Sequence, residues 1–395
     1  MNLKFRFIIT IIWILVATIN LISKEITIRK VKVIGNTYTD KEVIRLISGI
    51  KQGDKIDEDE LDSYIQKAKQ RLEITTYFFY VGVYVIPPLK YPQYRTIVIE
   101  VKEGFLYRFG GGPIYGLFGY ENFNGKADSI YLYAGYNIQR IIFINKFLFN
   151  SYWYYKIDLK HTLENYEVLG ANKELDISLF SLNFQPGYML TPDFKIFLIS
   201  KFNYYLVDDD IYKFPIPGCG VEYNTGNSFL SPTAGWYINF EYLYYINKDF
   251  YSITGKIVKY ISLTKIFTFA MLIQASTIQG NPPYFLLNRA EQIRTKLYSE
   301  LEGKNLYLGS IELRVPLKEF ILFGMVESVL KGIVFIDYGR GFNNTEIKIL
   351  KKGEFVYGAG IRLLLKMPVY LPVRLEYGYN EKNNSMIFFS TEKPF

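Results

Sequence analysis

Cysteine and histidine are almost absent from this chain of 395 residues, which contains one of each, Cys219 and His161. A single cysteine cannot form an intrachain disulfide, so cysteine usage does not indicate the compartment. Zinc sites of the usual kinds need several Cys or His ligands, and nucleophilic catalysis by Cys needs a nearby base. We therefore expect no metal site and no catalysis based on His or Cys.

Recognisable catalytic and phosphate-binding motifs are also missing. The glycine run in "YRFGGGP", residues 107–113, lacks the lysine of a P-loop, and no nucleophile stands near a candidate base. The formal net charge of +8 is spread along the chain without a block of Lys or Arg. We expect a protein that is not an enzyme, needs no cofactor and binds no nucleic acid, with its charge on a solvated surface or a pore lining.

Beyond the N-terminus, the chain has no uncharged apolar run as long as a membrane-spanning helix. At the N-terminus, Lys4 and Arg6 precede "FIITIIWILVATINLIS", residues 7–23, which has no charge and ends in a small residue. This pattern is typical of an export signal, and we predict that residues 1–23 form a cleaved signal peptide. The alternative is an uncleaved membrane anchor, because the run is about as long as the shortest spanning helices.

Residues 24–103 can be parsed into one compact α+β unit. A first strand stops at Gly35-Asn36, a short helix begins at Thr39 or Asp40, and a second helix follows Gly53. The predicted order is strand, helix, helix, strand, strand, with strands over 26–34, 77–86 and 95–101 and the longer helix over 58–72.

This unit resembles a POTRA module, the periplasmic domain of outer-membrane assembly and secretion proteins. The segments that carry the resemblance are "VKVIGNTYTDKEVI", "TTYFFYVGVYVIPP" after Leu72, and the closing "TIVIEVKEG". It implies an exposed sheet edge that pairs with an extended client segment by strand addition. The alternative is a domain that only spaces or orients the rest of the chain.

Alternation of apolar and polar residues dominates the rest of the chain. In "SYWYYKIDLKHTLE", residues 151–164, one set includes Trp153, Ile157 and Leu159, and the interleaved set includes Lys156 and Asp158. This pattern predicts a strand with one apolar face and one charged face. The same period returns over 130–139, 306–315 and "YLPVRLEYGYN", residues 370–380.

So many two-faced strands need somewhere to place their apolar faces, and no helices are evident to cover them. A sheet closed into a barrel in lipid meets this need, because apolar faces contact acyl chains, polar faces line a lumen, and no edge stays unpaired. At about 10 residues per spanning strand, roughly 16 antiparallel strands fit into residues 104–395. The 36 Tyr and 31 Phe suit aromatic girdles at the two membrane interfaces.

The C-terminal half resembles the barrel of the bacterial surface antigen family, the BamA and TamA superfamily. The segments that carry this resemblance are "GVEYNTGNSFLSPTAGWYINFEY", "NLYLGSIELRVPL", "GIVFIDYGRGF", "VYGAGIRLLL" and "PVRLEYGYN", in the order of the family. The closing "FFSTEKPF" with its terminal Phe395 resembles an outer-membrane strand signal. The resemblance implies a bacterial outer-membrane barrel with the POTRA-like domain in the periplasm.

The family resemblance also implies a surface loop that folds back into the lumen, with an Arg-Gly-aromatic tip. The matching segment is "NRAEQIRTKLYSELEGKN", residues 288–305, and its arginine is Arg294. The sequence departs from the pattern here, because Thr295 stands for the glycine and Lys296 for the aromatic residue.

The acidic partners that the resemblance implies for this arginine are Glu312 and Asp337. By alternation, Glu312 shares a face with Arg314, and Asp337 shares one with Phe335, and we predict that both faces line the lumen. A guanidinium between two carboxylates could form bidentate, charge-assisted bonds that lock the loop. The alternative is a solvated loop arginine, with the two acids paired to Arg314 or Arg362.

The function that the resemblance implies is assembly of outer-membrane proteins. The barrel's first and last strands would form a weak seam that pairs with incoming strands, and Gly110, Gly111 and Gly112 suit local weakness in the first strand. The same glycines could instead mark a bend between the domain and the barrel. The implied partners are unfolded outer-membrane proteins and outer-membrane lipids, with periplasmic chaperones or accessory lipoproteins as further candidates.

Two other functions stay open. A two-partner-type secretion pore shares the barrel and the POTRA type but usually has two POTRA units and a plugging helix, which are not evident here. A non-catalytic surface antigen or channel is compatible with the altered loop tip and the single POTRA-like unit.

Overall fold

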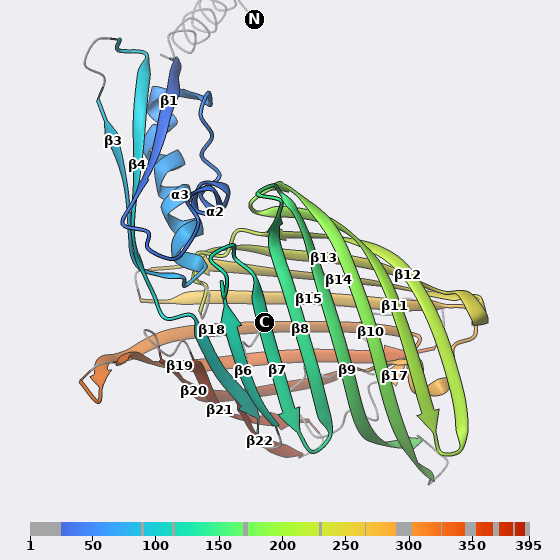
Figure 1. The fold of residues 1–395 in the computed structure, drawn as a ribbon. Coiled ribbons are helices and arrows are strands. Elements are labelled where there is room, and N and C mark those ends of the chain that lie inside the picture. The colour runs from blue at the N-terminus through green and yellow to red at the C-terminus, as the bar shows by residue number, and fades with distance from the viewer. Residues whose placement is uncertain are drawn as a thin grey trace, which may run out of the picture.

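The computed structural model describes residues 25–87, 91–112, 115–168, 173–228, 231–264, 266–289, 302–324, 326–343, 353–365, 371–381 and 384–391. These residues form a small N-terminal domain and a large barrel, and the domain stands on one end of the barrel wall (Figure 1). Predictions for residues 1–23, for Arg294 with its loop tip, and for Phe395 lie outside the described residues.

The N-terminal domain is a four-stranded sheet with two helices. Its strand order is β2 (Lys55–Asp57), β1 (Glu25–Ile34), β4 (Tyr94–Glu103) and β3 (Phe78–Ile86), and the helices are α2 (Lys41–Ser48) and α3 (Leu61–Ile74). β1 and β4 run parallel, whereas the other pairs are antiparallel. The predicted elements are present, and the structure adds β2 and the 3₁₀ turn Glu58–Glu60, which the sequence pattern did not predict.

Local signals in the sequence fix the ends of α2. The Asp40 carboxylate accepts a hydrogen bond from the backbone N–H of Glu42 at 2.9 Å, which satisfies a free donor at the helix start. Gly49 ends the helix with a φ of 74°, and its N–H donates to the carbonyls of Arg45 and Leu46. The buried apolar residues of the two helices are Val43, Ile44, Ile47, Leu61, Ile65, Ala68 and Leu72.

The barrel is one antiparallel sheet of 16 strands, in agreement with the predicted fold class of a membrane β-barrel preceded by a small α+β domain. The strands are β5 (Tyr107–Gly112), β6 (Tyr115–Glu121), β7 (Ser129–Gly135), β8 (Ile138–Leu148), β9 (Trp153–Val168), β10 (Lys173–Thr191), β11 (Phe194–Val207), β12 (Asp210–Asn224), β13 (Gly235–Tyr245), β14 (Phe250–Ser262), β15 (Thr268–Gln279), β18 (Asn305–Leu322), β19 (Val326–Phe342), β20 (Glu354–Leu365), β21 (Leu371–Asn380) and β22 (Ser385–Ser390).

Each strand pairs with the next along the chain, and β15 pairs with β18. Between β15 and β18, β16 (Asn288–Arg289) and β17 (Glu302–Gly303) form a separate two-residue ladder. The remaining described elements are two 3₁₀ turns, Ile246–Lys248 and Tyr284–Leu286. No described helix is long and apolar enough to cross a membrane.

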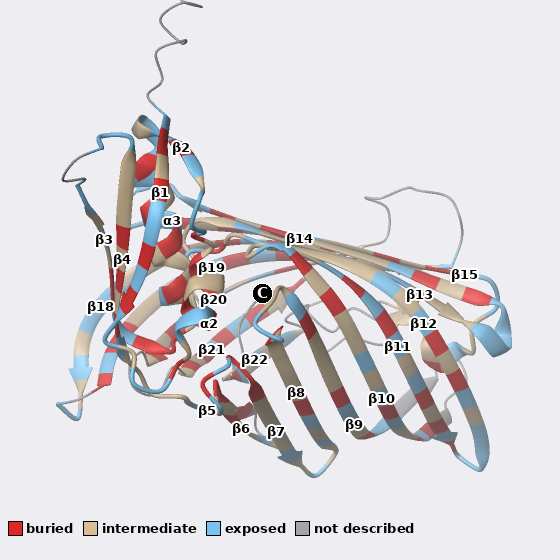
Figure 2. Cartoon of the chain, turned by 45° about the horizontal axis from the view of Figure 1, so that its top comes forward, coloured by how far each residue is buried: buried red, intermediate tan, exposed pale blue. Residues whose placement is uncertain are grey.

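Successive residues of a barrel strand alternate between two environments, and Figure 2 shows this as bands along the strands. Ile311 and Ile336 face outward and are 44% and 54% exposed, whereas Glu312 and Asp337 face inward and are 0% and 1% exposed. On β9, Trp153 lies outside and Asp158 inside. The apolar outer wall and polar inner wall are the arrangement expected for a barrel surrounded by lipid.

Candidate functional site

The barrel sheet ends at β5 and β22, and these two strands meet at a sparse seam. The backbone N–H of Thr391 donates to the carbonyl of Gly111 at 3.2 Å. The Thr391 hydroxyl also donates to that carbonyl and accepts from the Gly111 N–H. In the described part of the chain, these hydrogen bonds join the two ends of the sheet, whereas neighbouring strands elsewhere are joined by continuous ladders.

The predicted glycine run lies inside β5, at this seam. Gly110 pairs with Leu117, Gly111 with Gly116, and Gly112 with Tyr115. Gly111 has a φ of 144°, and a Cβ there would lie 2.3 Å from the carbonyl oxygen of Tyr115, so only glycine fits. β5 is six residues long and carries few side chains, which limits what holds it in place.

The inner wall of the barrel carries a buried chain of charged residues on β18, β20 and β21. Arg362 donates to both carboxylate oxygens of Glu312, at 2.6 and 2.9 Å, and to Glu376 at 2.7 Å. Arg314 donates to Glu312 at 2.7 Å, and Arg374 donates to Glu376 at 2.8 and 3.0 Å. All five residues are at most 5% exposed. The network therefore joins β18, β20 and β21 by charge-assisted bonds.

The three described residues of the predicted loop lock lie together on this wall. Glu312 is the register partner of Phe335, and Asp337 is the partner of Ser310, whose hydroxyl donates to it at 2.6 Å. Glu312 also holds Arg314 and Arg362, the pairings that the sequence left open as the alternative. The sequence identified Arg374 and Glu376 only as the polar face of a strand.

A second buried cluster, which the sequence pattern did not predict, lies where the barrel meets the N-terminal domain. Arg108 of β5 donates to both oxygens of Glu121 at 3.1 and 3.2 Å, and the Tyr131 hydroxyl donates to the same carboxylate at 2.7 Å. Close by, Lys146 of β8 donates to the hydroxyl of Tyr77 at 2.7 Å. Burial of this hydroxyl raises the pKa of Tyr77 above its ordinary value.

Further bonds fix the N-terminal domain on the barrel rim. Arg71 of α3 forms a bidentate pair with Asp193 in the β10–β11 turn, at 2.6 and 3.1 Å. Asn122 in the β6–β7 turn donates to the Thr39 hydroxyl at 2.8 Å. No local sequence pattern links these residues, because each pair is more than 80 positions apart.

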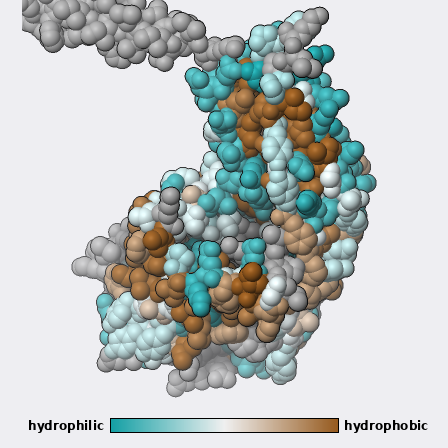
Figure 3. Space-filling model, turned by 90° about the vertical axis from the view of Figure 1, so that its left-hand side faces the viewer, coloured by the Kyte–Doolittle hydropathy of each residue, from teal (hydrophilic) through white to brown (hydrophobic). Residues whose placement is uncertain are grey.

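The outermost long strand of the N-terminal domain is β3, whose one partner strand among the described residues is β4. It exposes Phe79, Tyr80, Tyr84 and Ile86, each more than 40% accessible. Figure 3 looks onto this side of the molecule and shows apolar surface over the N-terminal domain. An exposed edge with apolar side chains is a template for an added strand.

The described residues contain no group of three or more His, Cys, Asp or Glu that could hold a metal ion. The described geometry offers three candidate sites: the β3 edge strand, the seam between β5 and β22, and the charged inner wall.

Comparison with known proteins identifies both parts of the chain. Residues 26–104 match a family model described as POTRA, surface antigen variable number repeat, and residues 118–390 match the Omp85 superfamily domain. None of the curated proteins matches the chain.

Solved structures share this fold at low sequence identity. BamA from Haemophilus ducreyi, lacking POTRA domains 1–3, is 14% identical with a TM-score of 0.56, and the match covers 92% of this chain and 83% of that one. CdiB from Escherichia coli is 9% identical with a TM-score of 0.62, covering 93% and 76%. CdiB from Acinetobacter baumannii is 10% identical with a TM-score of 0.55, covering 93% and 74%.

Proposed function

The chain belongs to the Omp85 superfamily, and we propose that it inserts β-barrel proteins into a bacterial outer membrane. In this proposal the barrel spans the outer membrane and the POTRA domain faces the periplasm. The clients are unfolded outer-membrane proteins, with lipids around the barrel and with chaperones or accessory lipoproteins as delivery partners. The process needs no covalent chemistry and no cofactor.

The observation that carries the proposal is the sparse seam between β5 and β22. A strand edge in lipid is costly, because its backbone N–H and C=O groups find no water to bond. A client strand that pairs with such an edge satisfies these groups, and this gives a driving force for templated insertion. Among the described residues, Gly111 and Thr391 supply hydrogen bonds across the seam, and in this mechanism those bonds give way to a client strand.

The POTRA domain supports the capture step. Its β3 edge exposes apolar side chains, including Tyr80 and Tyr84, and an extended client can add to it as a fifth strand. Strand addition uses mainly backbone hydrogen bonds, so it tolerates many client sequences. The Arg71–Asp193 pair holds this domain against the barrel rim.

The loop lock remains part of the proposal, with Glu312 and Asp337 as the acidic partners of Arg294. Glu312 and Asp337 both lie on the inner wall, Glu312 as the register partner of Phe335 and Asp337 as that of Ser310. Arg294→Asp and Asp337→Arg should each reduce insertion, and the double exchange should restore part of it. Equal loss in all three variants would contradict this pairing.

The test of the proposed function is depletion of the protein in its host, followed by quantitative outer-membrane proteomics. If the protein is an insertase, many barrel proteins fall together while lipoproteins keep their levels. Loss of one secreted protein alone would instead identify a dedicated exporter. No change, in a host without a redundant paralogue, would contradict both functions and leave a surface antigen or channel.

The role of the seam is tested by locking it. In a Cys219→Ser background, Gly110→Cys and Thr391→Cys place two thiols across the seam, because a Cβ at Gly110 lies 3.5 Å from the Thr391 hydroxyl. The oxidised pair should fail to complement depletion, and a reductant should restore function. Ile311→Cys with Ile336→Cys, on β18 and β19, is the matched control, since these strands are already fully paired. Unimpaired insertion by the locked seam would contradict the mechanism.

The second candidate function is a two-partner-type secretion pore, which the similarity to two CdiB structures favours. Such a pore would pass its substrate through the lumen and would work with the seam locked. The seam disulfide therefore separates the two functions, because insertion fails and secretion continues.

A further inference from the structure

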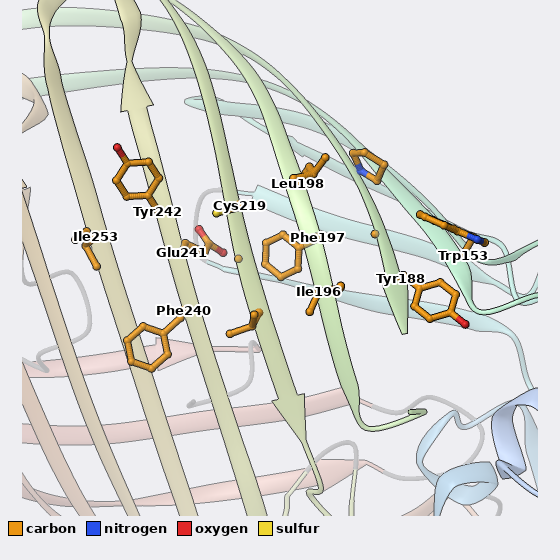
Figure 4. A pocket seen from close by; sticks show the side chains of 14 residues that line it. Trp153, Tyr188, Ile196, Phe197, Leu198, Cys219, Phe240, Glu241, Tyr242 and Ile253 are labelled. Carbon is orange, nitrogen blue, oxygen red and sulfur yellow. The ribbon is translucent and has the colours of Figure 1, made fainter. Parts of the chain in front are cut away.

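The outer wall of the barrel carries an apolar hollow of about 630 Å³ between β9 and β14. Figure 4 shows the side chains that line it, among them Trp153, Tyr188, Leu198, Cys219 and Phe240. Pockets that hold small organic ligands measure about 300–1,000 Å³, so the hollow has room for a bound molecule.

Short side chains among long ones create the hollow. Cys219 lies between Leu198 and Tyr242 on the same outward row, as the strand register shows. Leu198 is 64% exposed and Tyr242 is 40% exposed, so both stand up from the wall, whereas the thiol is short. Pro186 on β10 is a second short position within the lining. The floor therefore lies lower than its surroundings over several strands.

The lining is suited to hydrocarbon. Glu241 is the charged residue among those that line the hollow, and its neighbours Phe240 and Tyr242 face outward. Alternation therefore turns the Glu241 side chain toward the barrel interior. The side chains that face outward into the hollow are apolar or aromatic, so the occupant must be apolar as well.

The β9 to β11 side of the hollow lies at the end of the barrel that meets the N-terminal domain, where Asp193 in the β10–β11 turn pairs with Arg71. Trp153 is the first residue of β9, directly after the turn at that end of the barrel, and its ring lies 5.1 Å from that of Tyr188 in an edge-to-face arrangement. Trp and Tyr are enriched where a membrane wall meets the headgroup region. These two rings therefore indicate the level at which a lipid headgroup would sit.

We propose that a glycerophospholipid binds with one acyl chain in the hollow. This lipid belongs to the leaflet on the side of the N-terminal domain, and it is retained more firmly than the other lipids around the barrel. The wall and the lipid tails are equally apolar, so the preference cannot come from hydrophobic burial. It comes from packing, because an unfilled hollow loses dispersion contacts that a chain between the rings regains. The proposal requires that the barrel lies in a bilayer, but it does not depend on insertion activity.

The test is native mass spectrometry of the full chain, taken from nanodiscs of phosphatidylethanolamine and phosphatidylglycerol into a mild detergent. The wild type should keep one phospholipid per protein. Cys219→Phe fills the floor and should lower the lipid-bound fraction at least tenfold. Ile311→Phe, an equally outward-facing position on β18, is the matched control and should keep its lipid.

Three results would overturn the proposal: a wild type that keeps no lipid, equal retention by Cys219→Phe and the control, or a lipid-free dimer that Cys219→Phe separates. The last result would assign the hollow to a second copy of the chain. Heat-modifiable migration on a gel checks that each barrel is folded, and Cys219→Leu replaces the Phe variant if that variant does not fold.

Discussion

Individual residues allow the inner wall of the barrel to hold buried charged side chains. Arg362 lies between Glu312 and Glu376 and is 3% exposed. Room for this arrangement comes from Gly360 on β20, where a Cβ would lie 2.7 Å from the Glu376 side chain. The Cβ of any other residue at position 360 would clash with Glu376, so the network requires glycine there.

Loss of the Arg362 guanidinium should destabilise the barrel strongly. Arg362→Ala leaves two buried carboxylates with fewer partners, and the expected loss is about 3–5 kcal/mol of unfolding free energy. Urea unfolding of the reconstituted barrel measures this. Arg362→Lys keeps the charge but not the bidentate geometry, so its unfolding free energy should lie between those of the wild type and Arg362→Ala. If Arg362→Ala unfolds at the same urea concentration as the wild type, the network does not stabilise the wall.

The neighbouring glycines of β5 should differ in their tolerance of a side chain. Gly111→Ala places a Cβ against the Tyr115 carbonyl in a backbone region that suits glycine, and should cost about 1–3 kcal/mol. In Gly110→Ala the Cβ lies 3.2 Å from the flexible Leu117 side chain and 3.5 Å from the Thr391 hydroxyl, so this variant should be nearly neutral. The rate of hydrogen exchange in β5 should therefore rise in Gly111→Ala and stay unchanged in Gly110→Ala. Equal exchange in both would show that the φ of Gly111 is not a constraint.

At the scale of elements, α3 and the β10–β11 turn are coupled by the Arg71–Asp193 pair. The two side chains are 22% and 24% exposed, so solvent weakens their attraction without removing it. The bidentate geometry fixes the orientation of the helix relative to the turn.

A double-mutant cycle should detect this coupling. Arg71→Ala and Asp193→Ala should each loosen the domain, and their effects should be non-additive by about 1 kcal/mol. Thermal unfolding of the wild type, the two single variants and the double variant measures the coupling energy. The distribution of distances between spin labels on α3 and on the barrel measures how much the orientation of the domain varies. Additive effects together with an unchanged distance distribution would show that other contacts set the orientation.

Elements were largely predictable from the sequence, because each strand and helix carries its own period. Alternation predicted the barrel strands, and the spacing of Leu61, Ile65 and Leu72 predicted α3. β2 was missed because three residues are too few for a period to show. The Glu312–Arg362 pairing was only one of two alternatives, since it depends on the register of β18, β19 and β20 and not on local spacing.

For the whole molecule, the seam was predicted only as a family expectation, and its bonding could not be derived. Gly111 and Thr391 are 280 positions apart, and nothing in either segment specifies the other. The hydrophobic core that runs from the N-terminal domain into the barrel, and includes Phe147 and Phe197, could not be derived from the sequence either. Such contacts arise only after the sheet has curved and closed.

This shared core predicts that the N-terminal domain is more stable in the full chain than alone. A fragment of residues 25–104 loses the barrel side chains that pack on it, so more apolar surface is exposed. Hydrogen exchange in α3 should be at least tenfold faster in the fragment than in the reconstituted full chain. Equal protection would show that the two parts are energetically independent.

The sparse seam has a geometric consequence for the membrane around the protein. A ring of fully bonded strands has one circumference, fixed by the number and tilt of its strands. The ends of this ring meet at Gly111 and Thr391, and under the proposed insertion mechanism client strands would add between β5 and β22 and widen the ring while the ladders from β5 to β22 stay intact. Under that mechanism, the area that the protein occupies in the bilayer would grow with each client strand and would return to its starting value when the client leaves.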